Sequence, residues 1–288
     1  MGVHIIAQAA IQGLFMGAIY ALIALSMTLM FSVAGLLNFA HGDFMALAMF
    51  GALVLLQAFG LDPYVSAPIL FVGFAALGAL LFRFLIRPVL PQGLLVGAQM
   101  TLGLVIVLQN GLQLVFGGDY RSVPTVLSNR NLALAGFVLP WPLVVGALVA
   151  GVLAVALYCI LARTDFGRQV RAITQNRAAA ALMGIRIARV QAQAFALGFG
   201  LLGLTGPLIV SQVTITPSMG FNFTLVALIV MVFGGIGSFV GSLVGGLLIG
   251  LAEGVGSLLL GGTLGAMIPY LILLLVLLFR PHGLFGEG

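Results

Sequence analysis

The feature that most constrains this chain is a succession of apolar runs, each long enough to cross a bilayer. A transmembrane helix needs about 20 apolar residues to span the hydrocarbon core. Only 6% of the residues are charged, whereas a soluble domain carries about 25%. We therefore expect residues 1–288 to form a single, all-α, polytopic transmembrane domain. Uninterrupted candidates for its helices are residues 11–32, 64–86, 94–117, 141–162, 190–212 and 264–280.

Two further apolar regions are interrupted by polar residues or glycine. Residues 38–59 begin with the sequence NFAHGDF, and residues 221–260 contain GGIGSFVG. These interruptions predict broken or re-entrant segments near 38–45 and 234–241. About eight transmembrane helices are expected if one broken piece is only re-entrant. If every piece crosses, there are nine, and the amino terminus lies outside.

The arginines are concentrated in a few loops, and their distribution predicts an orientation. Residues 163–189 hold six of the 11 basic residues, Arg83 and Arg87 lie between two spans, and Arg280 follows the last span. Cytoplasmic loops carry the excess of Lys and Arg, so these three groups are expected on the cytoplasmic side. The 118–140 loop then lies outside, although it contains two arginines. The net charge of +5 thus reflects topology, and we expect contact with membrane lipid but not with nucleic acid.

The arginine-rich segment also contains a short predicted helix. Asn176 can accept hydrogen bonds from the free N–H groups of its first turn, and Gly184 can end it in a left-handed conformation. The helix would be about 10 Å long at about 1.5 Å per residue, and its alanines would form a nearly flat surface for another protein. We interpret it as a docking helix. The alternative is a loop that only sets orientation. The predicted docking helix comprises Asn176, Arg177, Ala178, Ala179, Ala180, Ala181, Leu182, Met183 and Gly184, and the coupling loop 163–189 around it includes Arg163, Gly167, Arg168 and Arg171.

Polar residues at the breaks are candidates for lining a substrate path. Non-helical backbone at membrane depth must line a cavity or be buried in protein, and transporters commonly place their substrate route at such breaks. A carboxylate inside an apolar run usually faces a cavity or a partner, although it can also be a structural group. For the first break the alternative is a capped helix start, with an acidic or amide side chain near the positive helix end. The candidate path residues are Asn38, His41, Asp43, Gly235, Gly237 and Glu253.

The sequence contains no recognisable catalytic or metal-binding motif. Without lysine it cannot form the G-x-x-x-x-G-K-[ST] phosphate loop, and it has neither G-x-S-x-G nor H-E-x-x-H. The single cysteine, Cys159, excludes an internal disulfide and a cysteine metal cluster. We expect no enzyme activity, catalytic residue, metal or cofactor in this chain. If ATP powers transport, another subunit must bind it.

Glycines recur at helical spacing in the second half of the chain. Gly241, Gly245, Gly246, Gly250 and Gly254 include overlapping G-x-x-x-G pairs, which allow helix backbones to approach closely in lipid. Close packing within this chain is the first interpretation, and an interface with another subunit is the alternative.

Three blocks of sequence resemble a known family. The first is GLLNFAHGDF at 35–44, which follows YALIALSMTLMFSVA, and the second is FGRQVRAITQNRAAAALMGI at 166–185. The third is GGIGSFVGSLVGGLLIGLAE at 234–253, followed by RPHGLFG at 280–286. In this order, over nearly the whole chain, they are similar to the inner-membrane permeases of branched-chain amino acid ABC transporters, of the LivH type.

The resemblance implies a multi-pass protein of the bacterial inner membrane. It implies pairing with a second, LivM-type permease and with two cytoplasmic ATPase subunits that bind ATP and Mg. A periplasmic amino acid-binding protein would deliver the substrate, and the docking helix would be the coupling helix seated in a groove of the ATPase. Related permeases import urea or short amides, which is the alternative for the substrate. An ion-coupled secondary transporter or a channel is the alternative for the mechanism, but a channel would need no docking helix.

Overall fold

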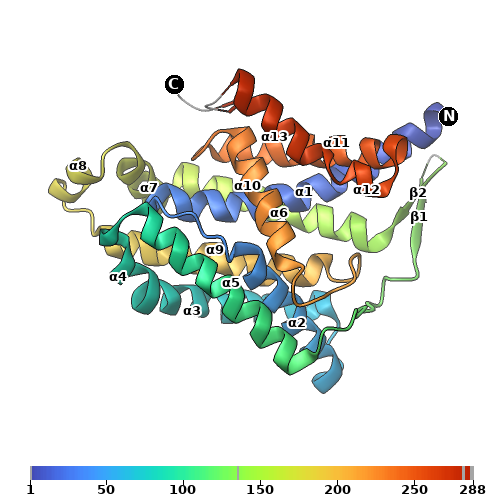
Figure 1. Ribbon diagram of the computed structural model, residues 1–288, viewed down its shortest axis with the longest axis horizontal. Helices are drawn as coiled ribbons and strands as arrows, with labels where there is room; N and C mark the ends of the chain where they lie inside the picture. Colours follow the sequence, from blue (N-terminus) through green and yellow to red (C-terminus); the bar gives the residue numbers. More distant parts are fainter. Residues whose placement is uncertain (1, 135, 281–282, 286–288) are drawn as a thin grey trace.

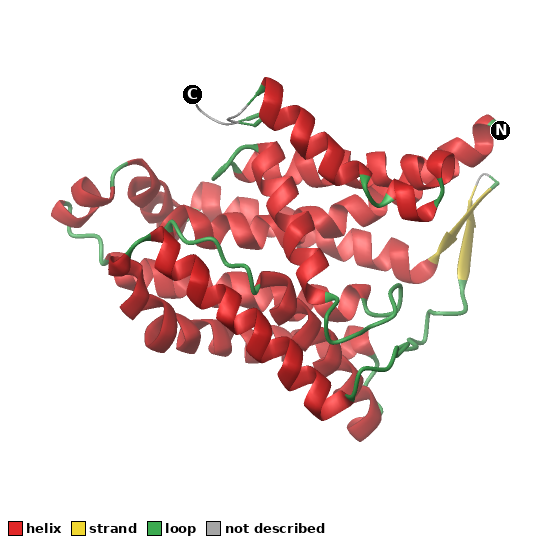
Figure 2. Cartoon of the chain, viewed as in Figure 1, coloured by secondary structure: helices red, strands yellow, loops and turns green. Residues whose placement is uncertain are grey.

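The computed structural model describes residues 2–134, 136–280 and 283–285, which form helices joined by loops and one β-hairpin (Figures 1 and 2). Within these residues, seven helices are long and apolar enough to cross a membrane, and two shorter apolar helices span Gly220–Gly234 and Ile268–Phe279. The expected all-α polytopic membrane protein is confirmed.

The elements are α1 (Val3–Ala34), α2 (His41–Phe59), α3 (Pro63–Leu81), a π turn η1 (Phe82–Ile86), α4 (Arg87–Val89), a 3-10 turn η2 (Leu90–Gln92), α5 (Leu94–Phe116), β1 (Asn131–Leu134), β2 (Phe137–Pro140), α6 (Trp141–Arg163), α7 (Asp165–Gln175), α8 (Arg177–Leu182), α9 (Ile187–Ile209), α10 (Gly220–Gly234), α11 (Phe239–Leu260), α12 (Gly262–Gly265) and α13 (Ile268–Phe279).

Helix α1 forms the centre of the bundle, and α11 packs along it in the opposite direction. Glycines allow the close approach: a Cβ atom on Gly246 would lie 2.5 Å from Ala21 Cα, and one on Gly254 would lie 2.7 Å from Gly13 Cα. Gly250 lies between them against Gly17. These contacts confirm that the glycine spacing on α11 serves packing within the chain. The matching glycines on α1 were not singled out from the sequence.

The first predicted break lies between α1 and α2. Helix α1 ends at Gly35, whose φ of 64° is left-handed, and residues 35–40 then run non-helically through the protein to the start of α2 (Figure 1). His41, the first residue of α2, contacts the Ser26 side chain. Because Ser26 lies two helical turns before the end of α1, α2 begins roughly 12 Å inside that end.

A second deep break lies between α9 and α10, where the sequence interpretation had not placed one. After Ile209 the chain turns back through residues 210–219, and α10 begins at Gly220. A Cβ on Gly220 would lie 2.5 Å from Asp43 Cα, so α10 starts against the start of α2. The break expected near 234–241 is also present, as the short turn between α10 and α11. Gly235 and Gly237 both have positive φ in that turn.

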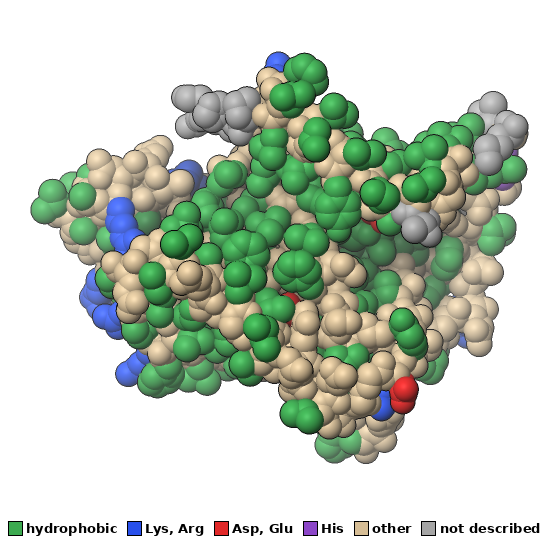
Figure 3. Space-filling model, viewed as in Figure 1, with side chains coloured by type: hydrophobic (Ala, Val, Ile, Leu, Met, Phe, Trp, Pro, Cys, Tyr) green, Lys and Arg blue, Asp and Glu red, His purple; other side chains and the backbone are tan. Residues whose placement is uncertain are grey.

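The two ends of the bundle differ in charge and structure. Arginine side chains gather at one end, over α4 and α7 to α9 (Figure 3); we call this the arginine end. The start of α1 and the antiparallel strands β1 and β2 lie at the other, the hairpin end (Figure 1). The hairpin was not predicted. It falls in the 118–140 loop that was expected to face outside, and its Val138 carbonyl accepts from Gln8 Nε2 on α1 at 3.1 Å.

Candidate functional site

The short helix predicted within the arginine-rich segment is present as α8 with its two caps, and we keep the name docking helix for it, although its role in docking stays a prediction. Asn176 Oδ1 accepts a hydrogen bond from Ala179 N at 3.0 Å and so caps the amino-terminal end. At the other end Gly184 has a φ of 84°. Its N–H donates to Ala181 O at 3.0 Å, and Ile185 N donates to Ala180 O at 3.1 Å. This pair of bonds is the Schellman motif, which satisfies the last carbonyl groups of a helix.

The exposed surface of the docking helix differs from the flat alanine face expected. Ala180 points into the protein and is only 4% exposed, because one face of so short a helix must pack against its own subunit. Leu182 is 89% exposed and Met183 82%. Two large apolar side chains therefore project at the arginine end, flanked by exposed Ala178 and Ala181.

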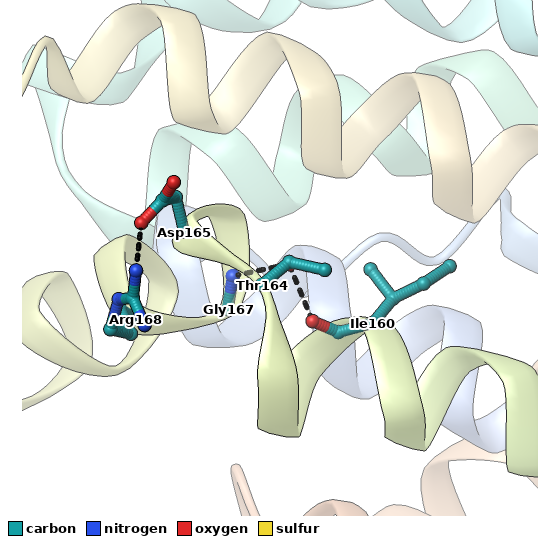
Figure 4. A network of polar contacts seen from close by, with 5 residues as sticks. All are labelled: Ile160, Thr164, Asp165, Gly167 and Arg168. Atoms are coloured by element: carbon teal, nitrogen blue, oxygen red, sulfur yellow. Dashed lines mark hydrogen bonds and ion pairs between the residues drawn. The ribbon is translucent and has the colours of Figure 1, made fainter.

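Helix α7 carries the docking helix and is capped by the end of α6. Thr164 Oγ1 accepts from Gly167 N at 3.3 Å and donates to Ile160 O at 2.6 Å (Figure 4). Asp165 points to Arg168, with which it forms an exposed ion pair (Figure 4). This pair lies within α7 and, being exposed, contributes at most about 1 kcal/mol to stability; Thr164 is the residue that connects α7 to α6.

The other residues predicted for the coupling loop hold α7 onto α6. Gly167 is buried, and a Cβ there would collide with the backbone of Leu161. The Arg171 guanidinium donates to the carbonyl oxygen of Leu161. Arg163 is the exposed last residue of α6. Beside this contact, a groove of about 480 Å³ separates α7 from the start of α9, and Arg189 and Met183 are among the residues that line it.

The amino-terminal turns of α2 and α10 meet inside the bundle, and we call this meeting point the half-helix junction (residues 41–44 and 220–224). Gly42 N donates to Thr224 Oγ1 at 2.8 Å. Asp43 is fully buried there, and its Oδ1 accepts from Gln109 Nε2 of α5 at 2.9 Å. Its Oδ2 has no protein partner. Each helix presents its positive end to the junction, which favours a negative charge at this point.

Asn38 and His41 lie beside the junction and have structural partners. Asn38 Oδ1 accepts from Ala40 N at 3.1 Å, so it shapes the turn that precedes α2. His41 Nε2 lies 2.9 Å from Ser26 Oγ and 3.1 Å from Ile23 O, while Nδ1 has no protein partner. Both side chains are buried. The structure thus brings Asn38, His41 and Asp43 together. Asn38 bonds within the turn before α2, and the N-cap residue of that helix, Ala40, makes no side-chain cap.

The remaining predicted path residues lie elsewhere. Gly235 and Gly237 form the α10–α11 turn, where the nearest atom to a Cβ on Gly237 would be Ser32 Oγ at 3.8 Å, close to the end of α1. Glu253 lines a separate cavity of about 310 Å³ with Tyr20, Gln12, Gln212 and other residues. Its Oε2 has no protein partner. The structure therefore does not join these three residues to the half-helix junction.

Sequence reasoning missed Gln109 and Thr224, which both contact the junction. A signal was present for the first. Gln109, Asn110 and Gln113 interrupt an otherwise apolar run with amide side chains, and amides at membrane depth need polar partners. Thr224 gave no signal, because a single threonine in a helix can bond its own backbone.

Comparison with known proteins decides the family. Residues 9–277 match the sequence family described as the permease component of the branched-chain amino acid transport system. The chain belongs to this family. It is a transport permease and, with its apolar helices, a multi-pass protein of the inner membrane. Of the RPHGLFG ending that contributed to the resemblance, Pro281, His282 and Gly286 lie outside the described residues.

Three curated relatives illustrate the similarity. The permease is 31% identical to the high-affinity branched-chain amino acid transport system permease protein BraD of Pseudomonas aeruginosa, over 97% of this chain and 95% of the relative. It is 29% identical to LivH of Escherichia coli K12 over the same shares. A probable LivH of Methanocaldococcus jannaschii is 28% identical over 92% of this chain and 88% of the relative. No solved structure matches the permease.

Proposed function

We propose that this permease is the transmembrane subunit of an ATP-binding-cassette importer for branched-chain, hydrophobic amino acids. The observation that carries the proposal is the docking helix, which is capped at both ends and presents Leu182 and Met183 to solvent at the arginine end. Large exposed apolar side chains outside the lipid are typical of a surface that binds another protein. The names of the curated relatives support the substrate class.

The partners in this proposal are a second, LivM-type permease, two cytoplasmic ATPase subunits and a periplasmic amino acid-binding protein. ATP and Mg bind to the ATPase subunits, and the permease itself contributes no catalytic residue and no metal site. Residues 1–288 act as one transmembrane domain. Asn38, His41, Asp43 and Glu253 remain candidates for the substrate path.

The contacts of α7 provide a route by which motion of the ATPase could reach the membrane helices. A push on the docking helix passes to α7, which is fixed to α6 by Thr164 and Arg171. Helix α7 also touches α1, since Thr174 Oγ1 donates to Ser32 O at 3.2 Å. The end of α1 leads directly into residues 35–40 and so to the half-helix junction. Movement of α7 would thus act on both α6 and the broken segment.

The test is co-purification and uptake with a variant of the docking surface. Leu182→Asp combined with Met183→Asp is expected to leave the permease in the membrane but to remove the ATPase subunits from the purified complex and abolish leucine uptake. Val126→Asp is the matched control, because Val126 is 73% exposed in the 118–140 loop on the opposite side.

Two results would overturn the proposal. One is a wild-type permease that purifies from native membrane without any ATPase. The other is normal leucine uptake by the double variant. If the wild-type complex took up urea but not leucine, the assignment as an importer would stand and the assignment of the substrate would be wrong.

A further inference from the structure

The half-helix junction contains a buried carboxylate whose hydrogen bonding is incomplete. Asp43 is 0% exposed, and within the described residues only Gln109 bonds its side chain from another element. Oδ2 is left without a protein partner. A buried carboxylate with a free oxygen is costly, and the two helix ends compensate only in part because their N–H groups are largely bonded elsewhere. An unmet acceptor of this kind suits a ligand that carries N–H donors.

Gln109 also lines a polar pocket. The pocket has a volume of about 230 Å³ and lies between α5 and the re-entrant segment 210–219. Amide and hydroxyl side chains dominate its lining, with Gln109, Asn110, Gln113, Tyr120, Thr216 and Ser218 among them. Gln109 therefore both lines the pocket and donates to the buried carboxylate.

Two observations show that this region lies near the surface of the subunit. Helix α5 is the least buried of the spanning helices among the described residues, so Gln109 lies on the spanning helix that the rest of the subunit covers least. Asn222, in the first turn of α10, is exposed. An exposed amide at membrane depth faces a cavity or another protein, because lipid cannot satisfy it.

We propose that Asp43 binds the α-ammonium group of the transported amino acid, and that Gln109 occupies this site until the substrate arrives. The inference rests on the proposed import of amino acids. An ammonium group offers three N–H donors and a positive charge, which match an acceptor-only carboxylate with one oxygen unpaired. The amide and hydroxyl groups of the pocket supply donors for the substrate carboxylate. This arrangement selects a zwitterion and rejects urea and simple amides, which lack the positive charge.

The test measures binding to the purified importer complex by protection from labelling. Cys159→Ser removes the native thiol, and Ser218→Cys places a probe in the pocket for reaction with a maleimide. Leucine is expected to slow this reaction, whereas 4-methylpentanoate, which lacks the ammonium group, is not. Asp43→Asn keeps the size of the side chain and the acceptor for Gln109. It should raise the leucine concentration needed for protection at least about tenfold, as expected for a lost charge-assisted hydrogen bond.

Two further variants separate this inference from a general loss of structure. Gln109→Ala leaves the carboxylate in place and should keep the preference for leucine over 4-methylpentanoate. Glu253→Gln tests the separate cavity as the rival site for the ammonium group, and it should change the protection far less than Asp43→Asn does. The inference is overturned if Asp43→Asn retains full protection, or if Glu253→Gln is the variant that loses it. If the wild-type complex takes up no amino acid at all, the proposed function itself has failed, whatever the labelling shows.

Discussion

Removing the Asn176 side chain is expected to loosen the docking helix without unfolding the protein. Asn176 Oδ1 accepts from Ala179 N at 3.0 Å, and loss of such a cap costs roughly 1 kcal/mol. A helix of six residues is marginal on its own, so it has little stability in reserve. A loss of about 1 kcal/mol lowers the ratio of formed to unformed helix about fivefold. If only the formed helix binds the ATPase, the apparent affinity falls by no more than that factor.

Hydrogen exchange and ATPase titration measure the two parts of this prediction. In Asn176→Ala the amide of Ala179 should exchange faster, while amides in α6 and α9 remain unchanged. The matched control is Asn176→Ser, because serine can also accept from the first turn, and it should restore most of the protection and affinity. The reasoning would be refuted if alanine and serine behaved alike. If Asn176→Ala weakened ATPase binding while the exchange of the Ala179 amide stayed unchanged, Asn176 would contact the ATPase directly.

Three further substitutions test contacts elsewhere in the permease. Gly246→Val should lower the melting temperature in detergent, because its Cβ would lie 2.5 Å from Ala21 Cα and overpacking costs about 1–3 kcal/mol. The control Gly151→Val, whose Cβ would point into open space on α6, should leave the melting temperature unchanged. Thr224→Val should destabilise the protein by about 1–3 kcal/mol, since the buried Gly42 N–H loses its acceptor, and Thr224→Ser should recover most of this in the same melting assay. Gly167→Ala should displace α7 from Leu161 and reduce ATP-driven uptake more than it reduces the amount of permease in the membrane; equal losses of both would contradict the role of this contact in coupling.

The transmembrane helices and the docking helix could be predicted because their signals are local. Apolar length identifies a span wherever it packs, and a cap depends only on the residues next to it. Asn176 and Gly184 therefore marked both ends of α8 correctly. The orientation of the same helix was less accessible. Which of four adjacent alanines turns inward depends on the body of the protein beneath it, and so the projection of Leu182 and Met183 appeared only in the structure.

The half-helix junction could be predicted only in its first half. NFAHGDF indicated a break because polar residues interrupt an apolar run there. Residues 210–219, with the sequence VSQVTITPSM, are polar and contain proline, so they resembled an ordinary loop between two spans and gave no sign that they fold back inside the bundle. Their partner contacts are distant in sequence, as the bond between Gly42 and Thr224 illustrates. Glu253 was predicted as a path residue because a carboxylate is costly in lipid. No sequence pattern indicated that it would line a cavity away from the half-helix junction.

The meeting of α2 and α10 has a consequence for how the chain enters the membrane. Helix α10 has 15 residues, about 22 Å at about 1.5 Å per residue, which is shorter than a hydrocarbon core of about 30 Å. Inserted alone, its free N–H groups would face lipid tails. The start of α2 is synthesised before α10, so the Gly42 N–H group lacks its acceptor until Thr224 has been added to the chain. The amino-terminal half of the permease therefore remains incompletely assembled until the re-entrant segment folds in, and membrane insertion and folding cannot be separate steps for this chain.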